Sequence, residues 1–385
     1  MRNLKRALSL AVASVMLVGM MVVGTGASYA DVTSDNNQEA IEVLQAVGAM
    51  VGDTDGNFNP DQNVTRNEMA VIMSNLLDYK VANYAGTAPF VDVPDWAEPY
   101  VAACYTHGIT GGTSATTYSG DDNVTATQAA LMMLKALGYF QYSSDFGENW
   151  ELATIRQANK IDLYDNVDVA ATAPMTRNDV AQLALNTLEA TMVDVSGEPA
   201  KVITPDGTTV TLGAAEYYDL TKTGTKYTAI SNQKDSDDST KYYVQLGEDL
   251  YDGDLVKKST SADDMGRPSI RWEYKGDKIG EYAEDVDDVL VINVDDTTTV
   301  QDVLKDKKYF NLSNSDIDAA VTYYLNGDEV TSGELKAGDK VEIFENDDNE
   351  VYVVAISRYE VVRIDDVDDD VTSTDSKNGT SYRVN

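Results

Sequence analysis

The fold of this chain is decided by a five-residue stretch that occurs twice, as Val64-Thr65-Arg66-Asn67-Glu68 and as Met175-Thr176-Arg177-Asn178-Asp179. A weaker copy, Val124-Thr125-Ala126-Thr127-Gln128, lies between them. Each copy is followed by apolar residues at the i, i+3, i+4, i+7 spacing that is typical of a helix with one buried face. Three copies of one motif in one part of the chain predict a repeat architecture.

The spacing of other residues tests whether the copies are related. Thr65 and Thr125 are 60 positions apart, and the step from Thr125 to Thr176 is shorter, 51 positions. The first offset also relates glycines, aromatic residues and polar residues around the motif, in the pairs Gly48 and Gly108, Gly52 and Gly112, Phe58 and Tyr118, Asp61 and Asp121, and Asn63 and Asn123. We therefore predict three helical repeats of one design.

Helix initiation explains the threonine and the acid of the motif. Thr65-x-x-Glu68 and Thr125-x-x-Gln128 are capping boxes, in which the two side chains satisfy backbone N–H groups of the first turn. The arginines are not explained in this way, because a cation in the first turn opposes the helix dipole by about 0.3–1 kcal/mol. Two interpretations of Arg66 and Arg177 stay open: an anion-binding role and a structural bridge to a neighbouring repeat.

Several spaced elements together resemble the S-layer homology (SLH) domain. They are the run Gly48–Pro60, the threonine motif after it, the segment Phe90-Val-Asp92-Val93-Pro-Asp-Trp96-Ala and the pair Gly108-Ile109. The resemblance covers about residues 36–192. It implies a pseudo-threefold helical bundle with ligand grooves between the repeats. It also implies non-covalent anchoring of a bacterial surface protein to the cell wall through pyruvate-bearing secondary wall polysaccharide.

Each copy departs from the family pattern in its own way. The first is expected to lack the Phe-x-Asp-Val opening, since the chain before Glu39 is polar. In the second, Ala126 replaces the arginine and Gln128 the acid, so we expect that groove to have lost its main anion contact. The third has Lys160-Ile161 where the family has Gly-Ile. The sequence thus predicts that one or two of the three grooves bind ligand.

The resemblance implies the composition of such a groove. A guanidinium can grip the carboxylate of a pyruvate ketal with two parallel hydrogen bonds, while an aromatic face supports the sugar ring. For the two tryptophans the alternative is a packing residue at the start of a short helix. The glycan-binding candidates are Arg66, Arg177, Asp92, Trp96, Glu68, Asp179 and Trp150.

The first thirty residues have the organisation of a secretory signal peptide. Met1–Arg6 is basic, Ala7–Val23 is apolar, and Ser28-Tyr29-Ala30 supplies small residues for cleavage before Asp31. We therefore expect a secreted chain at the cell wall or in an S-layer, with no membrane span after cleavage.

Composition excludes several function classes. A formal charge of −36 makes nucleic acid and anionic membranes implausible partners. The single cysteine, Cys104, forms no internal disulfide and is expected to be a core residue. The chain has one histidine, His107, and therefore lacks the His and Cys ligands of a zinc site. A hydrolytic triad would have to be built on this one imidazole. We expect no enzyme activity and no cofactor, with calcium at the acidic runs described below as the alternative.

Beyond Ser196 the pattern changes from helical periodicity to alternation. Asp206-Gly207 and Asn326-Gly327 are hairpin turn signals, and a short helix is expected at Val300–Leu304. The predicted strands are Lys241–Leu246, Ser269–Tyr274, Val289–Val294, Lys340–Phe344 and Val351–Ile356. Acidic runs at the strand ends are candidate calcium ligands. The alternative for these runs, such as Asp365–Asp370, is a solvated, solubilising face.

Taken together, the sequence predicts a multidomain protein with an all-α repeat bundle followed by small, mainly β modules. The expected parts are a signal peptide at 1–30, repeats at 31–83, 84–142 and 143–196, and β-rich modules at 197–296 and 297–385. The predicted function is non-catalytic anchoring to secondary wall polysaccharide or another peptidoglycan-linked polymer, with the β region displayed or self-associating in an S-layer lattice. The alternative is an anchored enzyme that acts on glycan or peptide through β-region carboxylates.

Overall fold

The computed structural model divides into two compact units. Unit 1 comprises Met1–Thr260 and Ile270–Tyr282, and unit 2 comprises Ser261–Ser269 and Ala283–Asn385. The predicted helix at Val300–Leu304, the leader up to residue 28 and most of the acidic runs lie outside the described residues. The structure describes residues 29–33, 36–197, 199–204, 206, 209–260, 265–284, 286, 288–291, 321–336, 339–345, 351–356, 364–368 and 381–384.

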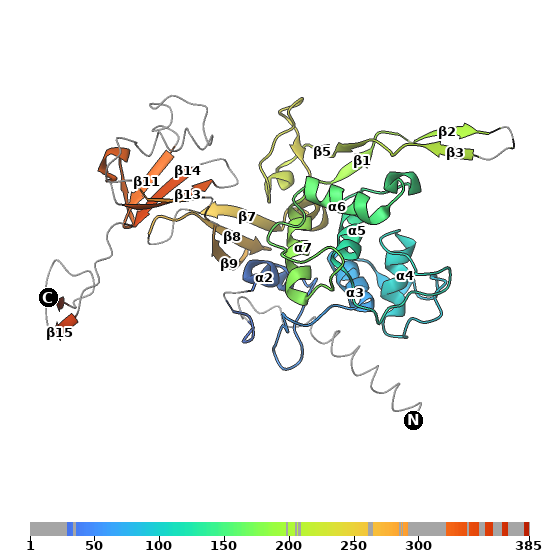
Figure 1. Ribbon diagram of the computed structural model, residues 1–385, viewed down its shortest axis with the longest axis horizontal. Helices are drawn as coiled ribbons and strands as arrows, with labels where there is room; N and C mark the ends of the chain where they lie inside the picture. Colours follow the sequence, from blue (N-terminus) through green and yellow to red (C-terminus); the bar gives the residue numbers. More distant parts are fainter. Residues whose placement is uncertain are drawn as a thin grey trace. The chain divides into compact units, whose positions relative to one another are not determined.

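Two helices form each of the three repeats in unit 1 (Figure 1). Short 3₁₀ turns, η2 (Val81–Asn83) and η3 (Ser143–Phe146), precede the second and third pairs. The pairs are α2 (Gln38–Ala46) with α3 (Arg66–Leu76), α4 (Glu98–Thr106) with α5 (Ala126–Ala136), and α6 (Trp150–Lys160) with α7 (Arg177–Glu189).

The predicted capping boxes are confirmed at the start of α3 and α5, and α7 begins with a third. Their N-cap residues are Thr65, Thr125 and Thr176, and each threonine side chain accepts the N–H of the residue three positions on. In return, Glu68 Oε2 accepts the Thr65 N–H at 2.8 Å, and Asp179 Oδ2 accepts the Thr176 N–H at 2.9 Å. The threonine and the acid thus start the helices, as helix-capping chemistry requires.

The repeats contact one another in a closed order. α3 packs against α4, α5 against α6, and α7 returns to α2. At the motif turns, the Val124 N–H donates to the Val64 carbonyl at 2.9 Å, and the Met175 N–H donates to the Val124 carbonyl at 3.0 Å. The Val64 N–H closes the ring on the Met175 carbonyl at 3.0 Å. Each repeat therefore pairs part of its backbone with the other two.

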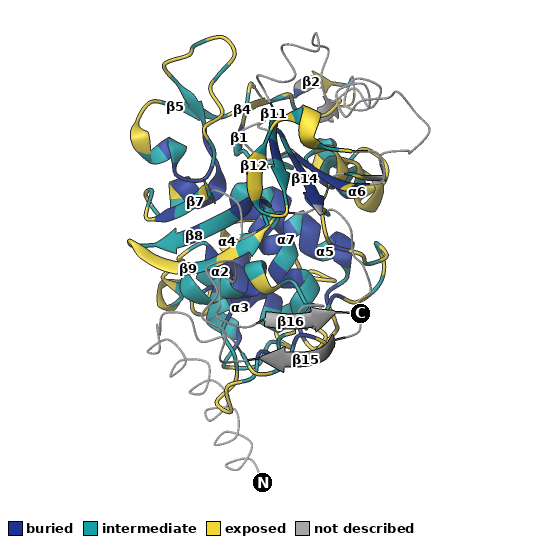
Figure 2. Cartoon of the chain, turned by 90° about the vertical axis from the view of Figure 1, so that its left-hand side faces the viewer, coloured by how far each residue is buried: buried dark blue, intermediate teal, exposed yellow. Residues whose placement is uncertain are grey.

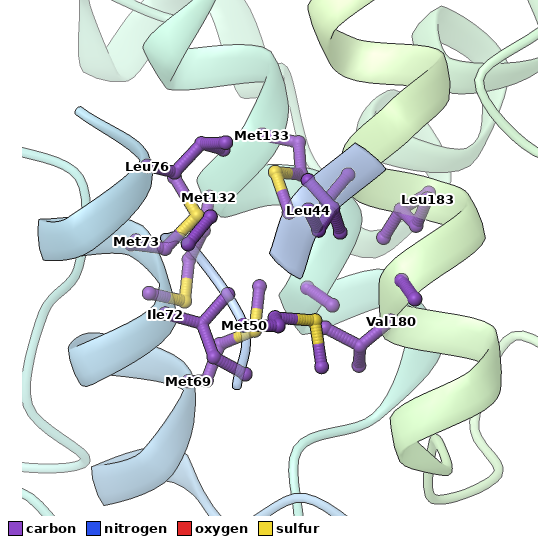
Figure 3. Close-up of a cluster of buried hydrophobic side chains, with 14 of the residues drawn as sticks. Leu44, Met50, Met69, Ile72, Met73, Leu76, Met132, Met133, Val180 and Leu183 are labelled. Atoms are coloured by element: carbon purple, nitrogen blue, oxygen red, sulfur yellow. The ribbon is translucent and has the colours of Figure 1, made fainter. Parts of the chain in front are cut away.

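One apolar core lies among the helices, and Figure 3 shows side chains from the three repeats meeting in it. The i, i+3, i+4 stripes supply this core, and Figure 2 draws large parts of α5 and α7 as buried. Cys104 is fully buried, and burial raises its thiol pKa to about 11, which confirms a core residue. The residues labelled in the close-up are Leu44, Met50, Met69, Ile72, Met73, Leu76, Met132, Met133, Val180 and Leu183.

The rest of unit 1 is a set of short ribbons followed by a three-stranded sheet. β1 (Val193–Val195) pairs with β4 (Tyr217–Asp219), the predicted Asp-Gly hairpin is β2 (Ala200–Ile203) with β3 (Thr209–Leu212), and β5 (Thr221–Lys222) pairs with β6 (Tyr242–Tyr243). A 3₁₀ turn η4 (Thr225–Thr228) and a helix α8 (Leu246–Leu250) also occur. Of the predicted strand Lys241–Leu246, Tyr242–Tyr243 form β6 and Gln245 makes an isolated bridge to Thr191, while Leu246 begins α8.

The three-stranded sheet of unit 1 lies beside α2 (Figure 1). It consists of β7 (Leu255–Thr260), β8 (Ser269–Tyr274) and β9 (Asp277–Ala283), in that order. Trp272 of β8 is fully buried in the same core as the helices, and its Nε1 donates to Glu39 Oε1 of α2 at 2.5 Å. The Tyr282 hydroxyl of β9 donates to Glu42 Oε2. Helices and sheet thus share one core.

Unit 2 contains a five-stranded sheet in the order β10-β13-β14-β11-β12. All its pairs are antiparallel except β11 with β14. A 3₁₀ turn η5 (Ser332–Glu334) follows β12. The strands are β10 (Asp288–Val291), β11 (Val321–Leu325), β12 (Asp328–Val330), β13 (Lys340–Glu345) and β14 (Val351–Ile356), and a separate pair is β15 (Ile364–Asp368) with β16 (Ser381–Val384).

The order of helices followed by small sheets confirms the coarse fold class. The predicted strands at Ser269–Tyr274 and Val351–Ile356 are confirmed residue by residue. No helix within the described ranges is both long and apolar enough to span a bilayer.

Candidate functional site: the arginines at the repeat junctions

Arg66 reaches from the first repeat into the second. It is the first residue of α3, and its Nε donates to the Tyr118 carbonyl at 3.1 Å while Nη2 donates to the Gly111 carbonyl at 2.9 Å. Its Cζ lies 4.6 Å from the centre of the Tyr118 ring. The Tyr118 hydroxyl donates back to the Arg66 carbonyl at 3.1 Å. The side chain and the loop of the second repeat therefore hold each other in place.

Arg177 makes the same set of contacts from the third repeat to the first. Its Nε donates to the Phe58 carbonyl at 2.7 Å and its Nη2 to the Val51 carbonyl at 2.8 Å. Its Cζ lies 4.6 Å from the centre of the Phe58 ring. Burial lowers the pKa of Arg177, while nearby acids such as Glu68 raise it, and a guanidinium stays cationic at neutral pH.

Both arginines are structural bridges between repeats. Each uses Nε–H and one Nη2–H for this purpose, which leaves both hydrogens of Nη1 and one of Nη2. Among the described residues, none accepts a hydrogen bond from Nη1 of either arginine. The remaining hydrogens define one edge of the planar group, and an edge of this kind matches the two oxygens of a carboxylate.

Asp92 shapes the loop over which Arg66 lies. Its two carboxylate oxygens accept the N–H groups of Tyr118 and Ser119, each at 2.8 Å. The hydrogen bond from Tyr118 is the main reason that the pKa of Asp92 is lowered, and the charge of Arg66 contributes in the same direction. Asp92 is therefore positioned beside the arginine and helps to orient its partners.

Comparison with known proteins agrees with this geometry. The S-layer homology domain family matches residues 28–70 and 89–130. These two segments are S-layer homology domains. Such domains are cell-wall anchoring modules that bind wall polymers, and their presence together with surface-protein relatives indicates a secreted protein at the cell surface.

Among similar proteins are two surface proteins and an enzyme. The chain is 28% identical over 189 residues to the Surface-layer 125 kDa protein of Lysinibacillus sphaericus, a match that covers 45% of this chain and 16% of that protein. It is 27% identical over 213 residues to the Cell surface protein of Thermoanaerobacter kivui, covering 52% of this chain and 27% of the relative. An Endoglucanase of Bacillus sp. (strain KSM-635) is 32% identical over 110 residues, covering 26% and 12% respectively. The matches thus span only a minor part of each relative.

The second S-layer homology repeat meets the third without an arginine. At this junction the Ala126 N–H donates to the Ala173 carbonyl at 3.1 Å, and Thr127 Oγ1 donates to the Ala171 carbonyl at 2.8 Å. The Tyr164 hydroxyl donates to the Ala126 carbonyl at 3.4 Å, in the manner of Tyr118 at the first junction. The second and third repeats therefore contact each other through these hydrogen bonds, without an arginine at the junction.

The other predicted site residues have varied surroundings. Glu68 and Asp179 are engaged in their capping boxes. Trp96 is partly buried and packs against the core, in line with the packing alternative. Trp150, the first residue of α6, is 38% exposed. Of the two tryptophans, Trp150 therefore has the more accessible ring.

One expectation about the first repeat is wrong. Tyr29-Ala30-Asp31-Val32 provides the opening that the repeat was expected to lack, and the family match begins at residue 28. Asp31 accepts the N–H groups of Phe58 at 2.8 Å and Asn59 at 2.6 Å, as Asp92 does in the second repeat. The signal was present in the sequence, because Tyr29 and Asp31 each lie 61 positions before Phe90 and Asp92. It was obscured by its overlap with the expected cleavage site.

Metal ligation was predicted only for the acidic runs, most of which fall outside the described residues. Within the described part of the chain, no group of three or more His, Cys, Asp or Glu side chains is arranged to hold a metal ion.

Proposed function

We propose that this chain anchors a surface protein to the cell wall by binding the pyruvate carboxylates of secondary wall polysaccharide at the Arg66 and Arg177 junctions. The observation that carries the proposal is the matched pair of guanidinium groups, each fixed by two backbone carbonyls and one ring. On each guanidinium group, the N–H groups of Nη1 and one of Nη2 remain for a ligand.

The physical basis is preorganisation. A flexible arginine loses side-chain entropy when it binds an anion, at about 0.5–1.5 kcal/mol per immobilised side chain. Here the hydrogen bonds within the protein have already ordered the group, so less entropy is lost on binding. Hydrogen bonds between a guanidinium and a carboxylate are also about twice as strong as neutral ones.

We propose further that the three repeats form a pseudo-threefold bundle with two ligand-binding junctions. The closed packing order of α2 to α7 and the ring of backbone hydrogen bonds at Val64, Val124 and Met175 support this arrangement. The third junction carries Ala126 in place of arginine and is proposed to be inactive toward anions.

We propose a non-catalytic role for the chain, with the β region displayed or taking part in an S-layer lattice. The surface relatives named above support this reading. An anchored enzyme is the second candidate, because an endoglucanase is among the similar proteins. Release of reducing sugar from wall glycan by the purified chain would favour the enzyme.

Binding to isolated wall sacs tests the proposal. We expect the unchanged chain to co-sediment with native sacs and to lose binding at least tenfold when pyruvate is removed chemically from the polymer. This comparison leaves the protein untouched, so it separates ligand contact from the bridging role of the arginines. Equal binding to both kinds of sac would refute the carboxylate as the ligand.

Substitutions give the complementary test. Arg66→Lys with Arg177→Lys keeps both charges but cannot bridge two carbonyls and present a planar edge, so weaker binding is expected. Arg156→Ala, on the exposed face of α6, is the matched control and should bind as the unchanged chain does. Circular dichroism of each variant reports whether the helices persist.

A further inference from the structure

The segment Tyr29–Val32 is built into the first repeat. Asp31 binds the backbone of the Phe58 loop with both carboxylate oxygens, as Asp92 binds that of the Tyr118 loop. The two carboxylates therefore fix the aromatic residues over which Arg177 and Arg66 lie.

Tyr29 takes the place that Phe90 has in the second repeat. Its ring centre lies 5.5 Å from that of Phe58, and the ring centre of Phe90 lies 5.3 Å from that of Tyr118. Its hydroxyl oxygen also accepts the Gly52 N–H at 2.7 Å. Partial burial of Tyr29 raises the pKa of its hydroxyl.

Glycines at equivalent positions make room for these two rings. A Cβ on Gly52 would lie 2.3 Å from Cε1 of Tyr29, and a Cβ on Gly112 would lie 2.4 Å from Cε1 of Phe90. Backbone oxygens lie about as near, with Asn57 O 2.6 Å from the Cβ position of Gly52 and Ser114 O 2.4 Å from that of Gly112. Contacts this short do not occur, so both positions require glycine, and the ring of Tyr29 lies against Gly52 as the ring of Phe90 lies against Gly112.

A leader cut after Ala30 would discard this ring. It would leave Asp31 as the first residue and place a charged α-amino group next to the carboxylate that binds the Phe58 loop. The sequence also offers an A-x-A-like site three positions earlier, at Thr25-Gly26-Ala27, with Ser28 after the cut. A cut there leaves the whole opening of the first repeat in the mature chain.

We propose that leader removal occurs N-terminal to Tyr29, by hydrolysis of the Ala27–Ser28 bond. Water adds to this amide, so that Ala27 ends in a carboxylate and Ser28 begins with an α-ammonium group. The mature chain then keeps Tyr29 as the aromatic residue of the first repeat, next to Phe58 and Gly52. This inference concerns maturation and stands whether or not the arginines bind polymer.

The first test is the intact mass and the N-terminal sequence of the full chain secreted by a bacterial host. A mature chain that starts at or before Tyr29, with Ser28 as the expected residue, supports the proposal. A mature chain that starts at Asp31 or later overturns it.

The second test compares melting temperatures of secreted variants. If Tyr29 is retained, Tyr29→Ala should lower the melting temperature by roughly 5–15 °C, close to the effect of Phe90→Ala, because both remove a packed ring. Tyr218→Ala, at an exposed position of β4, is the control and should have little effect. If the leader takes Tyr29 with it, the Tyr29→Ala and unchanged mature chains are identical and must melt at the same temperature, which would overturn the proposal.

Discussion

Arg66 and Arg177 combine two roles that are usually assigned to different residues. Each donates to two backbone carbonyls of the next repeat, and each is stacked on an aromatic ring at 4.6 Å. A first-turn cation is unfavourable for its own helix. Its hydrogen bonds to the neighbouring repeat offset that cost, which explains why the motif places arginine where helix capping alone would not.

Asp92 predicts a pH dependence at the residue scale. Its folded pKa lies below the usual 3.8, so its contribution to stability is fully present above pH 3.8 and is lost as the pH falls through the folded pKa. We expect Asp92→Asn to melt below the unchanged chain at pH 6, because the amide oxygen cannot accept both N–H groups as well. The difference in melting temperature between the two chains should narrow as the pH falls below 3.8. A difference that stays constant down to pH 2 in thermal scans would contradict this account.

At the scale of elements, α2 contacts β8, and this contact cannot be predicted from the helical repeat pattern. Trp272 is fully buried, and its indole N–H donates to Glu39 of α2. Tyr282 of β9 makes a similar bond to Glu42. Two side chains of the sheet are therefore hydrogen-bonded to α2, and Trp272 belongs to the same core as the helices.

Removal of this contact is expected to destabilise unit 1 strongly. Trp272→Ala deletes a large side chain from a closed core and should lower the free energy of unfolding by about 3–5 kcal/mol. Trp272→Phe keeps most of the packing but loses the hydrogen bond, and should cost about 1–3 kcal/mol. Trp150→Ala, at a partly exposed site, is the control and should cost less than either. Urea unfolding followed by circular dichroism measures all three, and equal midpoints for Trp272→Ala and Trp150→Ala would be the contrary result.

For the whole molecule, the net charge of −36 contrasts with the two cationic junctions. Long-range repulsion between the chain and an anionic polymer is screened beyond about 8–10 Å at physiological salt. Recognition of a carboxylate therefore depends on the local geometry at Arg66 and Arg177 rather than on the overall charge.

The extent of the folding unit is testable with fragments. Because Leu246, Leu255 and Trp272 belong to the same core as the helices, a fragment of residues 29–282 should unfold in one cooperative transition. A fragment of residues 29–196 lacks these side chains and should melt lower by roughly 10 °C or more. Differential scanning calorimetry of the two fragments decides the question. Equal melting temperatures would show that the helical repeats are stable without the sheet.

Much of the helical part could be read directly from the chain. The capping boxes at Thr65, Thr125 and Thr176 and the apolar stripes behind them depend on residues within one or two turns of each other. Hairpins with Asp-Gly and Asn-Gly turns were predictable for the same reason. Local hydrogen bonding and side-chain periodicity set these elements, and neither requires knowledge of distant partners.

The sequence by itself determined the repeats, their helix starts and the loss of arginine in the second copy. Only the tertiary structure decided what the arginines contact, since their carbonyl partners lie 45 to 126 positions away. It also decided that Asp31 binds the Phe58 loop and that Trp272 completes the core. The physical reason is that these contacts depend on how the chain closes on itself, and short-range periodicity carries no information about that closure.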